Sequence, residues 1–172
     1  LLNTIDPDAA RRLHPSDRKR IIRALEVYYE TGETITAHNL KTQAVPPRYT
    51  PVWLGLDFEP RQALYDRIDL RVDIMLRQGL VEEIRQLLAS GIPAGCTAMQ
   101  AIGYKEFVAA LSGSGTIREA ADQVRQASRH YAKRQLTWFR RNPNIHWLTR
   151  HPGEDFPEIL QKARQVLHEI DN

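Results

Sequence analysis

The segment from Arg129 to Arg141 carries the residue types that bind nucleic acids. It contains five arginine or lysine residues, one histidine and three aromatic residues, and it contains no acidic residue. Cationic side chains attract phosphate groups, and aromatic rings offer faces on which bases stack. This composition predicts an RNA or DNA contact. The alternative is that Trp138 and Phe139 belong to an apolar core, and we favour that alternative for Phe139.

A second basic group, Arg18–Arg20 with Arg23, lies at the expected start of a helix. The N-terminus of a helix carries about half a positive charge, which disfavours each cation there by ~0.3–1 kcal/mol. A bound anion reverses this balance, because the dipole, the free N–H groups and the side chains all attract it. The group therefore predicts an anion contact. The alternative is a solvated basic face that Asp17 and Glu26 partly offset.

Two arginines, Arg67 and Arg71, are four residues apart and would share one face of a helix. A forked guanidinium matches the paired oxygens of a diphosphate better than an ammonium does. We expect Asp66, Asp69 and Asp73 to orient these arginines through salt bridges. The alternative, which the residues alone favour, is a surface network of aspartates and arginines.

The segment Gln100–Lys105 places Gly103 inside a helical pattern. Glycine inside a helix costs about 1 kcal/mol relative to alanine, so we expect another backbone or a nucleotide to approach closely there. The alternative is a glycine that lets two helices pack. Elsewhere the sequence has no phosphate-binding P-loop motif, no metal-ligand spacing among its six histidines, and no partner base for its single cysteine, Cys96.

The periodicity of apolar residues predicts a mainly helical fold with one or two short strands. A short apolar run at 52–56 resembles a buried strand of a parallel sheet, and a second strand is expected at 145–148. Prolines predict a linker at 39–50. The predicted helices, bounded by capping residues, glycines and prolines, are 7–13, 16–31, 60–78, 80–90, 98–111, 117–140 and 156–170.

Composition limits the class of protein. The 172 residues are 42% hydrophobic and 26% charged with a net charge of +3, so basic residues gather in local patches. One cysteine allows no internal disulfide, which fits a cytoplasmic protein. No apolar run reaches the roughly 18 residues of a membrane span. The sequence begins with Leu1, and we interpret it as part of a longer protein.

Five ordered blocks of residues resemble the bacterial tRNA dimethylallyltransferases, also called tRNA isopentenyltransferases. Members of that family transfer a dimethylallyl group from dimethylallyl diphosphate to N6 of adenine 37, beside the tRNA anticodon. The resemblance extends from about Asp6 to Leu148, with Ser16 where asparagine is common. The blocks are His14–Val27, Thr31–Gly32, Arg67–Glu83, Met99–Glu106 and Arg129–Arg140.

The resemblance implies the C-terminal portion of a P-loop NTPase-like α/β enzyme with a helical insertion. Residues 1–50 would end the insertion and form a linker, and residues 51–172 would return to the α/β core and add C-terminal helices. The phosphate-binding loop, which is of the type found in nucleotide-binding proteins, would precede this chain, as would the general base and the Mg²⁺ ligands. The chain alone is therefore expected to be inactive. The expected partners are a tRNA anticodon stem-loop and dimethylallyl diphosphate, and a cytoplasmic monomer without membrane attachment is expected.

The resemblance also implies roles for individual residues. Arg71 aligns with the arginine that helps to hold the diphosphate, and Arg67 would support it. No residue of this chain is expected to bind a metal ion. Residues that align with tRNA-contacting segments are Lys19, Arg20, Ile21, Ile22, Arg23, Gln100, Ala101, Ile102, Gly103, Tyr104, Lys105, Arg129, Lys133, Arg134, Gln135, Leu136, Thr137, Trp138, Phe139 and Arg140.

Two other functions remain open from the sequence. One is an adenylate isopentenyltransferase, which acts on a free nucleotide and would need neither the long basic helix nor the helical insertion. The other is a non-catalytic helical RNA-binding module, for which a phosphate loop elsewhere in the protein would be the discriminating feature.

Overall fold

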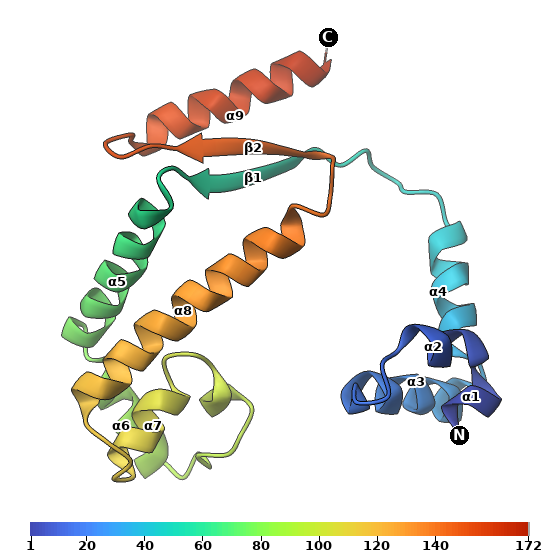
Figure 1. The fold of residues 1–172 in the computed structure, drawn as a ribbon, viewed down its shortest axis with the longest axis horizontal. Helices are drawn as coiled ribbons and strands as arrows, with labels where there is room; N and C mark the ends of the chain where they lie inside the picture. The colour runs from blue at the N-terminus through green and yellow to red at the C-terminus, as the bar shows by residue number, and fades with distance from the viewer. Residues whose placement is uncertain (172) are drawn as a thin grey trace. The chain divides into compact units, whose positions relative to one another are not determined.

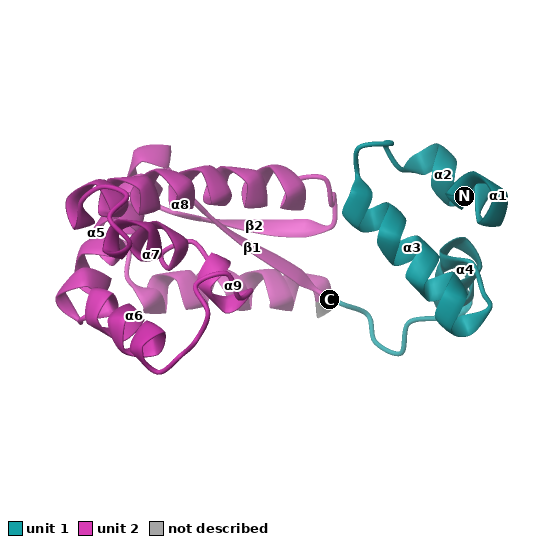
Figure 2. Cartoon of the chain, turned by 90° about the horizontal axis from the view of Figure 1, so that it is seen from below, with its two compact units in different colours: residues 1–51 teal, residues 52–172 magenta. Residues whose placement is uncertain are grey.

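The computed structural model describes residues 1–171, and the chain forms two compact units (Figure 2). The first unit comprises Leu1–Pro51, and the second begins at Val52. Residues 45–52 between them take no regular structure. Three prolines in and around this stretch remove backbone donors and restrict the preceding residues, which accounts for the absence of a helix there.

The first unit is helical, and its core consists of small buried residues around Leu2, Ala9 and Ala24. The expected capping residues are confirmed: the Ala9 amide donates to the Asp6 carboxylate at 3.0 Å, and Gly32 ends a helix with a φ of 74°. The predicted start of the linker, residue 39, is wrong, because a helix continues to residue 44, just before the prolines. The helices are α1 (Leu2–Ile5), α2 (Pro7–Arg12), α3 (Arg18–Thr31) and α4 (Ile35–Ala44).

The second unit contains two strands that pair in parallel, as expected. Strand β1 (Trp53–Phe58) pairs with β2 (Ile145–Arg150), and Gly55 lies opposite Trp147. A Cβ at Gly55 would lie 2.7 Å from Cγ2 of Ile145 and 2.8 Å from Cε3 of Trp147. Such distances are too short for a carbon contact, so the close packing of β2 against β1 requires glycine at this position.

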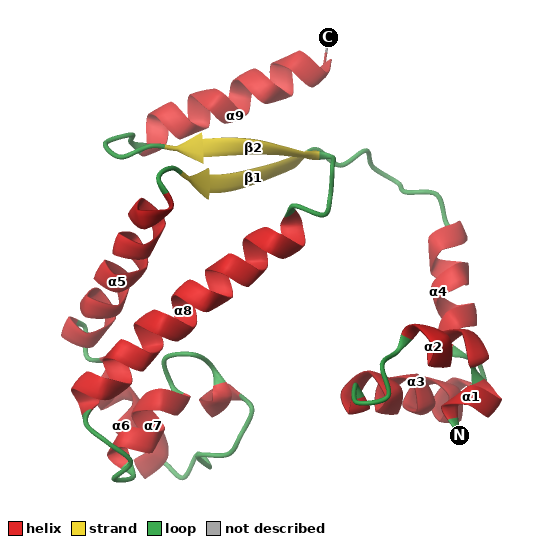
Figure 3. Cartoon of the chain, viewed as in Figure 1, coloured by secondary structure: helices red, strands yellow, loops and turns green. Residues whose placement is uncertain are grey.

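Helices lie on both sides of the strand pair (Figures 1 and 3). Helix α9 (Phe156–Asp171) lies along β2, while α5 (Arg61–Arg77) and α8 (Ile117–Phe139) lead away from the other side. These three helices and the second strand are confirmed within a few residues of their predicted ends. The remaining elements are α6 (Leu80–Ala89), the 3₁₀ turn η1 (Ala98–Gln100) and α7 (Lys105–Leu111).

The main core lies where α5, α6, α7 and α8 converge. Its largest fully buried side chains are Val72, Ile84, Met99, Phe107 and Val124. Burial of each such side chain stabilises the fold by about 1.5–3 kcal/mol. The core therefore fixes the N-terminal half of α8 against its neighbours.

The single helix predicted at 98–111 is wrong, because the chain turns between η1 and α7. Gly103 has a φ of 96°, in the left-handed region that L-residues with a side chain rarely adopt. Apart from its two chain neighbours, no residue of the described chain comes within 4 Å of a Cβ built at this position. The glycine therefore serves the turn, and neither helix packing nor close approach by another part of residues 1–171 explains it.

Candidate functional site

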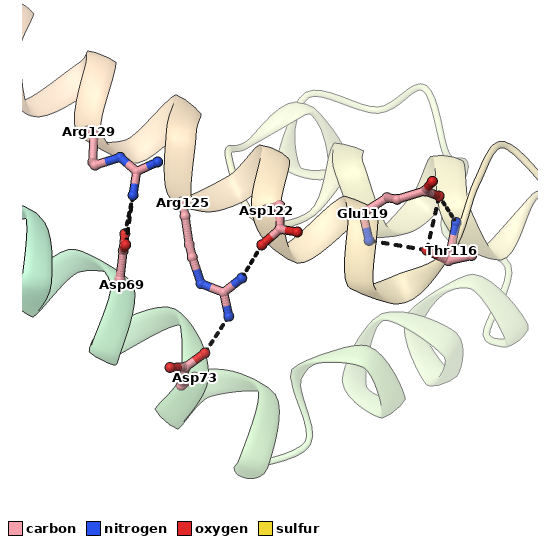
Figure 4. Close-up of polar contacts among 7 residues, drawn as sticks. All are labelled: Asp69, Asp73, Thr116, Glu119, Asp122, Arg125 and Arg129. Atoms are coloured by element: carbon pink, nitrogen blue, oxygen red, sulfur yellow. Dashed lines mark hydrogen bonds and ion pairs between the residues drawn. The ribbon is translucent and has the colours of Figure 1, made fainter.

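Charged residues join α5 to α8 along one face of each helix (Figure 4). Nη1 of Arg129 donates to both carboxylate oxygens of Asp69, at 2.8 and 2.7 Å. One turn away, Arg125 donates to Asp73 through Nη2 and to Asp122 through Nη1, the latter at 2.5 Å. The hydrogen bond with Asp73 raises the pKa of Arg125 above its ordinary value. We call Asp69, Asp73, Arg125 and Arg129 the α5–α8 ladder.

The α5 aspartates therefore have other partners than those predicted. We expected Asp66, Asp69 and Asp73 to orient Arg67 and Arg71, and this expectation is wrong. Two of the three pair with α8, and Asp66 accepts a hydrogen bond from a glutamine of its own helix. A helix turns by about 100° per residue, so side chains two positions apart point to nearly opposite sides. The ladder thus directs the two arginines away from α8.

The two predicted diphosphate arginines differ in their surroundings. The guanidinium of Arg67 lies 5.8 Å from the centre of the Phe58 ring. Arg71 is exposed and makes no hydrogen bond or ion pair with any residue of the described range 1–171. An unpaired guanidinium retains its full set of N–H donors for an anionic ligand.

Beyond Arg129, the cations of α8 no longer face the α5 aspartates. Lys133 forms no ion pair within the part of the chain that the structure describes. The guanidinium of Arg134 lies 5.7 Å from the centre of the Tyr131 ring. Arg140, past the end of α8, donates to Asp57 at 2.5 Å. The C-terminal half of α8 therefore presents Lys133 and Arg134 to an external anion.

Two aromatic side chains accompany these cations at the surface. Trp138 is 64% exposed and Phe139 is 38% exposed, and their ring centroids lie 4.9 Å apart in a T-shaped arrangement. The core position that we favoured for Phe139 is wrong. The neighbouring Leu136, which we expected to contact RNA, is buried and holds α8 to the unit.

Two carboxylates hold the turn at Gly103. The buried Glu106 accepts a hydrogen bond from the Gly103 amide at 2.9 Å, and its carboxylate lies 3.7 Å from Nζ of Lys105. The Tyr104 hydroxyl donates to Oε1 of Glu83 at 2.5 Å, and this hydrogen bond raises the pKa of Tyr104. The turn is therefore fixed from two sides, with Gln100, Ala101 and Lys105 exposed on it.

An apolar groove of about 610 Å³ brings parts of two predicted segments together. Ile102 of the turn and Gln135 of α8 both line it, together with Tyr131. Leu64 and Ile68 of α5 also belong to its apolar lining, and the sequence did not single them out as functional residues. Tyr131 lies in the basic and aromatic segment Arg129–Arg141, and the composition of that segment already indicated a nucleic-acid contact.

The remaining predicted RNA-contacting residues lie in the first unit. Arg20 forms an exposed ion pair at 3.3 Å with Asp17, just before α3, and Arg23 forms one at 3.4 Å with Glu26 of α3. Lys19 and Ile22 are exposed, whereas Ile21 packs against the small core of the unit. The basic face expected here is thus present, and only part of it is offset by acids.

The strands leave an apolar surface exposed within residues 1–171, although the sequence suggested a buried strand at 52–56. Trp53, Leu54 and Leu56 are 47%, 41% and 48% exposed. With Leu136 and Phe139 they line a pocket of about 320 Å³. Within residues 1–171, β2 is the only strand that pairs with β1. Unpaired strand edges with apolar side chains are surfaces that other elements commonly cover.

Residues 1–171 contain no group of three or more histidine, cysteine, aspartate or glutamate side chains that could hold a metal ion. None of their helices is long and apolar enough to cross a membrane.

Curated relatives match the chain over most of its length. The tRNA dimethylallyltransferase of Thermoanaerobacter sp. (strain X514) is 44% identical over 167 residues, which cover 96% of this chain and 53% of that protein. The tRNA dimethylallyltransferase of Desulforudis audaxviator (strain MP104C) is 49% identical over 170 residues, which cover 99% of this chain and 53% of that protein. The chain spans about half the length of these relatives.

Solved structures and a family model agree with these relatives. The full-length tRNA isopentenylpyrophosphate transferase of Bacillus halodurans is 39% identical with a TM-score of 0.65, covering 99% of this chain and 51% of that one. The tRNA delta(2)-isopentenylpyrophosphate transferase of Staphylococcus epidermidis is 36% identical with a TM-score of 0.65, covering 98% and 54%. The model of the IPP transferase family matches residues 1–142. The chain belongs to the IPP transferase family.

Proposed function

We propose that the chain is part of a tRNA dimethylallyltransferase, which transfers the dimethylallyl group of dimethylallyl diphosphate to N6 of adenine 37 in tRNA. Family membership and the similarity to relatives that are tRNA dimethylallyltransferases support this proposal. The observation within the chain that carries it is Arg71, whose guanidinium has no partner in residues 1–171. The α5–α8 ladder supports the same reading, because it fixes the rotation of α5 and thereby the direction of Arg71.

The reaction breaks the bond between C1 of the dimethylallyl group and a diphosphate oxygen, and it forms a bond between C1 and N6. The electron pair of the broken bond leaves with the diphosphate, and N6 gives up one proton to a base. Negative charge increases on the leaving diphosphate. Arg71 would therefore stabilise the transition state more than the ground state. Arg67, held against Phe58, would support it from one turn away.

The RNA must also present its base. Adenine 37 would have to leave the stack of the anticodon loop, which costs a few kcal/mol. Lys133 and Arg134 would attract the phosphates of the loop, and the exposed rings of Tyr131 and Trp138 would offer stacking surfaces for unstacked bases. The C-terminal half of α8 would in this way hold the RNA while the base is displaced.

The family resemblance implies Mg²⁺, a nucleotide-type phosphate loop and a general base. Residues 1–171 offer no cluster of carboxylates and histidines that fits a metal ion. We therefore assign no magnesium ligand and no general base to this chain.

The test uses the full-length protein and measures dimethylallylated adenosine by mass spectrometry. Arg71→Ala is expected to lower kcat/KM for dimethylallyl diphosphate by about 10²–10³-fold, because a preorganised donor to developing charge is lost. The Kd for tRNA should stay unchanged. Arg71→Lys keeps the charge but loses the fork, and an intermediate rate is expected.

Arg77→Ala is the matched control, because Arg77 is an exposed arginine at the end of the same helix. It should retain wild-type kinetics. Wild-type kinetics in Arg71→Ala would remove Arg71 from the diphosphate site. A wild-type protein that forms no dimethylallylated adenosine would overturn the proposed reaction itself.

A further inference from the structure

The first unit contains a pocket of about 310 Å³ whose charged lining is wholly basic. Arg12 of α2, Arg20 and Arg23 of α3, and Asn39 of α4 line it, and the other lining residues are apolar. No acidic side chain occurs among the described residues of this lining. Guanidinium groups that face one pocket with no carboxylate in its lining repel one another, and an anion bound between them converts that repulsion into attraction.

Arg12 is held in place at this pocket. Its Nε donates to the carbonyl oxygen of Asp8 at 3.3 Å, and its Nη2 donates to Oγ1 of Thr36 at 2.9 Å. Its Nη1 has no hydrogen-bond partner within residues 1–171. One edge of an oriented guanidinium is therefore available to a ligand.

Behind Arg12, the buried Asp6 joins α2 to α4. Its carboxylate accepts hydrogen bonds from the amides of Ala9 and Thr36, both at 3.0 Å, and from the Thr36 hydroxyl at 2.8 Å. Burial alone would raise the pKa of Asp6, but these hydrogen bonds and the charge of Arg12 outweigh it and hold the pKa below its ordinary value. The ionised Asp6 thus orients Thr36, which in turn accepts the hydrogen bond from Arg12.

Arg20 and Arg23 reach the pocket from α3, and the buried Ala24 beside them also lines it. Their pairs with Asp17 and Glu26 are long, at 3.3 and 3.4 Å, and exposed to solvent. Exposed pairs of this kind contribute about 0.2–1 kcal/mol each. A phosphate bound between the guanidinium groups can therefore compete with them at small cost.

We propose that this pocket binds one phosphate group of an RNA backbone, with Arg12 as a contact in addition to Arg20 and Arg23. Guanidinium forks match phosphate oxygens, and the Asn39 amide adds a neutral donor. The exposed Lys19 continues the positive charge along α3, which favours a polyanion over a free phosphate ion. That the RNA is tRNA rests on the proposed function, whereas phosphate binding by the pocket does not.

The test measures binding of a fluorescein-labelled anticodon stem-loop RNA to the 172-residue chain across a salt series. Arg12→Ala should weaken binding and reduce the slope of log Kd against log salt by about 0.7–0.9, the value for one phosphate contact. Arg11→Ala is the matched control, because Arg11 is the adjacent arginine, pairs with Asp8 and does not line the pocket. Equal slopes in the two variants would overturn the proposal.

Arg12→Ala also removes the hydrogen bond to Thr36, so a second variant leaves that network intact. Asn39→Asp places a carboxylate in the pocket at an exposed position, and it should weaken RNA binding at least as much as Arg12→Ala. Wild-type affinity in Asn39→Asp would contradict the proposal. Inorganic phosphate serves as a competitor: if Arg12→Ala abolished phosphate binding but left RNA affinity intact, the RNA part would be overturned.

The full-length protein separates this proposal from the proposed reaction. Arg12→Ala should raise KM for tRNA several-fold and leave kcat unchanged, because the pocket lies in the first unit and holds only the RNA backbone. A protein that binds RNA through Arg12 but forms no dimethylallylated adenosine would refute the reaction and support the pocket. A protein that forms the product with an unchanged KM for tRNA in Arg12→Ala would support the reaction and refute the pocket.

Discussion

The two halves of α8 carry the same kind of side chain at the same spacing, yet the side chains have different partners. Arg125 and Arg129 are four residues apart and pair with Asp73 and Asp69 of α5 (Figure 4). Lys133 continues the four-residue spacing and has no acidic partner within residues 1–171. A cation on a helix therefore gains its role from the surface that faces it, and the type and spacing of the residue leave that role undecided.

The reason for the difference lies on α5. Asp73 and Asp69 are four residues apart on α5 and pair with the α8 arginines. One turn before Asp69, the helix carries Tyr65 and no further acid, so α5 offers no partner to the next cation of α8. Beyond that point Leu64 and Tyr131 line an apolar groove. The N-terminal half of α8 is thus neutralised and anchored, whereas Lys133 in its C-terminal half has no acidic partner within residues 1–171.

The largest effect on stability is expected where the ladder is most buried. Arg125→Met keeps the aliphatic length but leaves Asp73 and Asp122 without their cation. The side chain of Arg125 is 22% exposed, so the free energy of unfolding should fall by about 1–2 kcal/mol. Urea unfolding of the chain measures it. Arg118→Met, at an exposed position of the same helix, should stay within about 0.5 kcal/mol of wild type, and equal losses in both variants would remove the distinction.

The next largest effect is expected in the salt dependence of RNA binding, and it differs between the two halves of α8. Lys133→Ala with Arg134→Ala should reduce the slope of log Kd against log salt by about 1.4 for a single-stranded loop, because two phosphate contacts are lost. Arg129→Ala should leave the slope unchanged, since Asp69 already neutralises that side chain. Its expected effect is instead a lower free energy of unfolding. If Arg129→Ala reduced the salt slope as much as the Lys133→Ala, Arg134→Ala double variant, Arg129 would have to leave Asp69 and contact an RNA phosphate.

Local patterns in the sequence were sufficient for most of the helices and for both strands, because apolar periodicity and capping residues act over a few positions. They failed where the decisive contact lies far along the chain. The partners of Asp69 are an example, because a neighbouring arginine on α5 and Arg129 on α8 satisfy the same charge rule. Phe139 is another, since its 38% exposure depends on what the β1 residues opposite it leave uncovered. The prediction of one helix through Gly103 failed for a different reason. The sequence does not distinguish a glycine in the left-handed conformation from a glycine inside a helix.

The smallest effect concerns the cap at which the anchored half of α8 begins. The Thr116 hydroxyl accepts a hydrogen bond from the Glu119 amide at 3.1 Å, and the Glu119 carboxylate accepts one from the Thr116 amide at 2.7 Å. The hydrogen bonds from the amide and hydroxyl of Thr116 lower the pKa of Glu119 below its ordinary value of 4.5. A carboxyl whose pKa is lower in the folded state stabilises the fold above its ordinary pKa. That contribution is lost as pH falls through the folded-state pKa.

Glu119→Gln keeps an oxygen that can accept the Thr116 amide but removes the titration. The free energy of unfolding of the wild type should therefore exceed that of Glu119→Gln above pH 4.5, and the difference should shrink steadily as pH falls below that value. Urea unfolding at a series of pH values measures this convergence. Glu59→Gln is the control, because the exposed Glu59 side chain makes no hydrogen bond or ion pair within residues 1–171. A difference between Glu119→Gln and wild type that persists at low pH would mean that the amide side chain fits the cap poorly. The charge of Glu119 would then have no part in anchoring this half of α8.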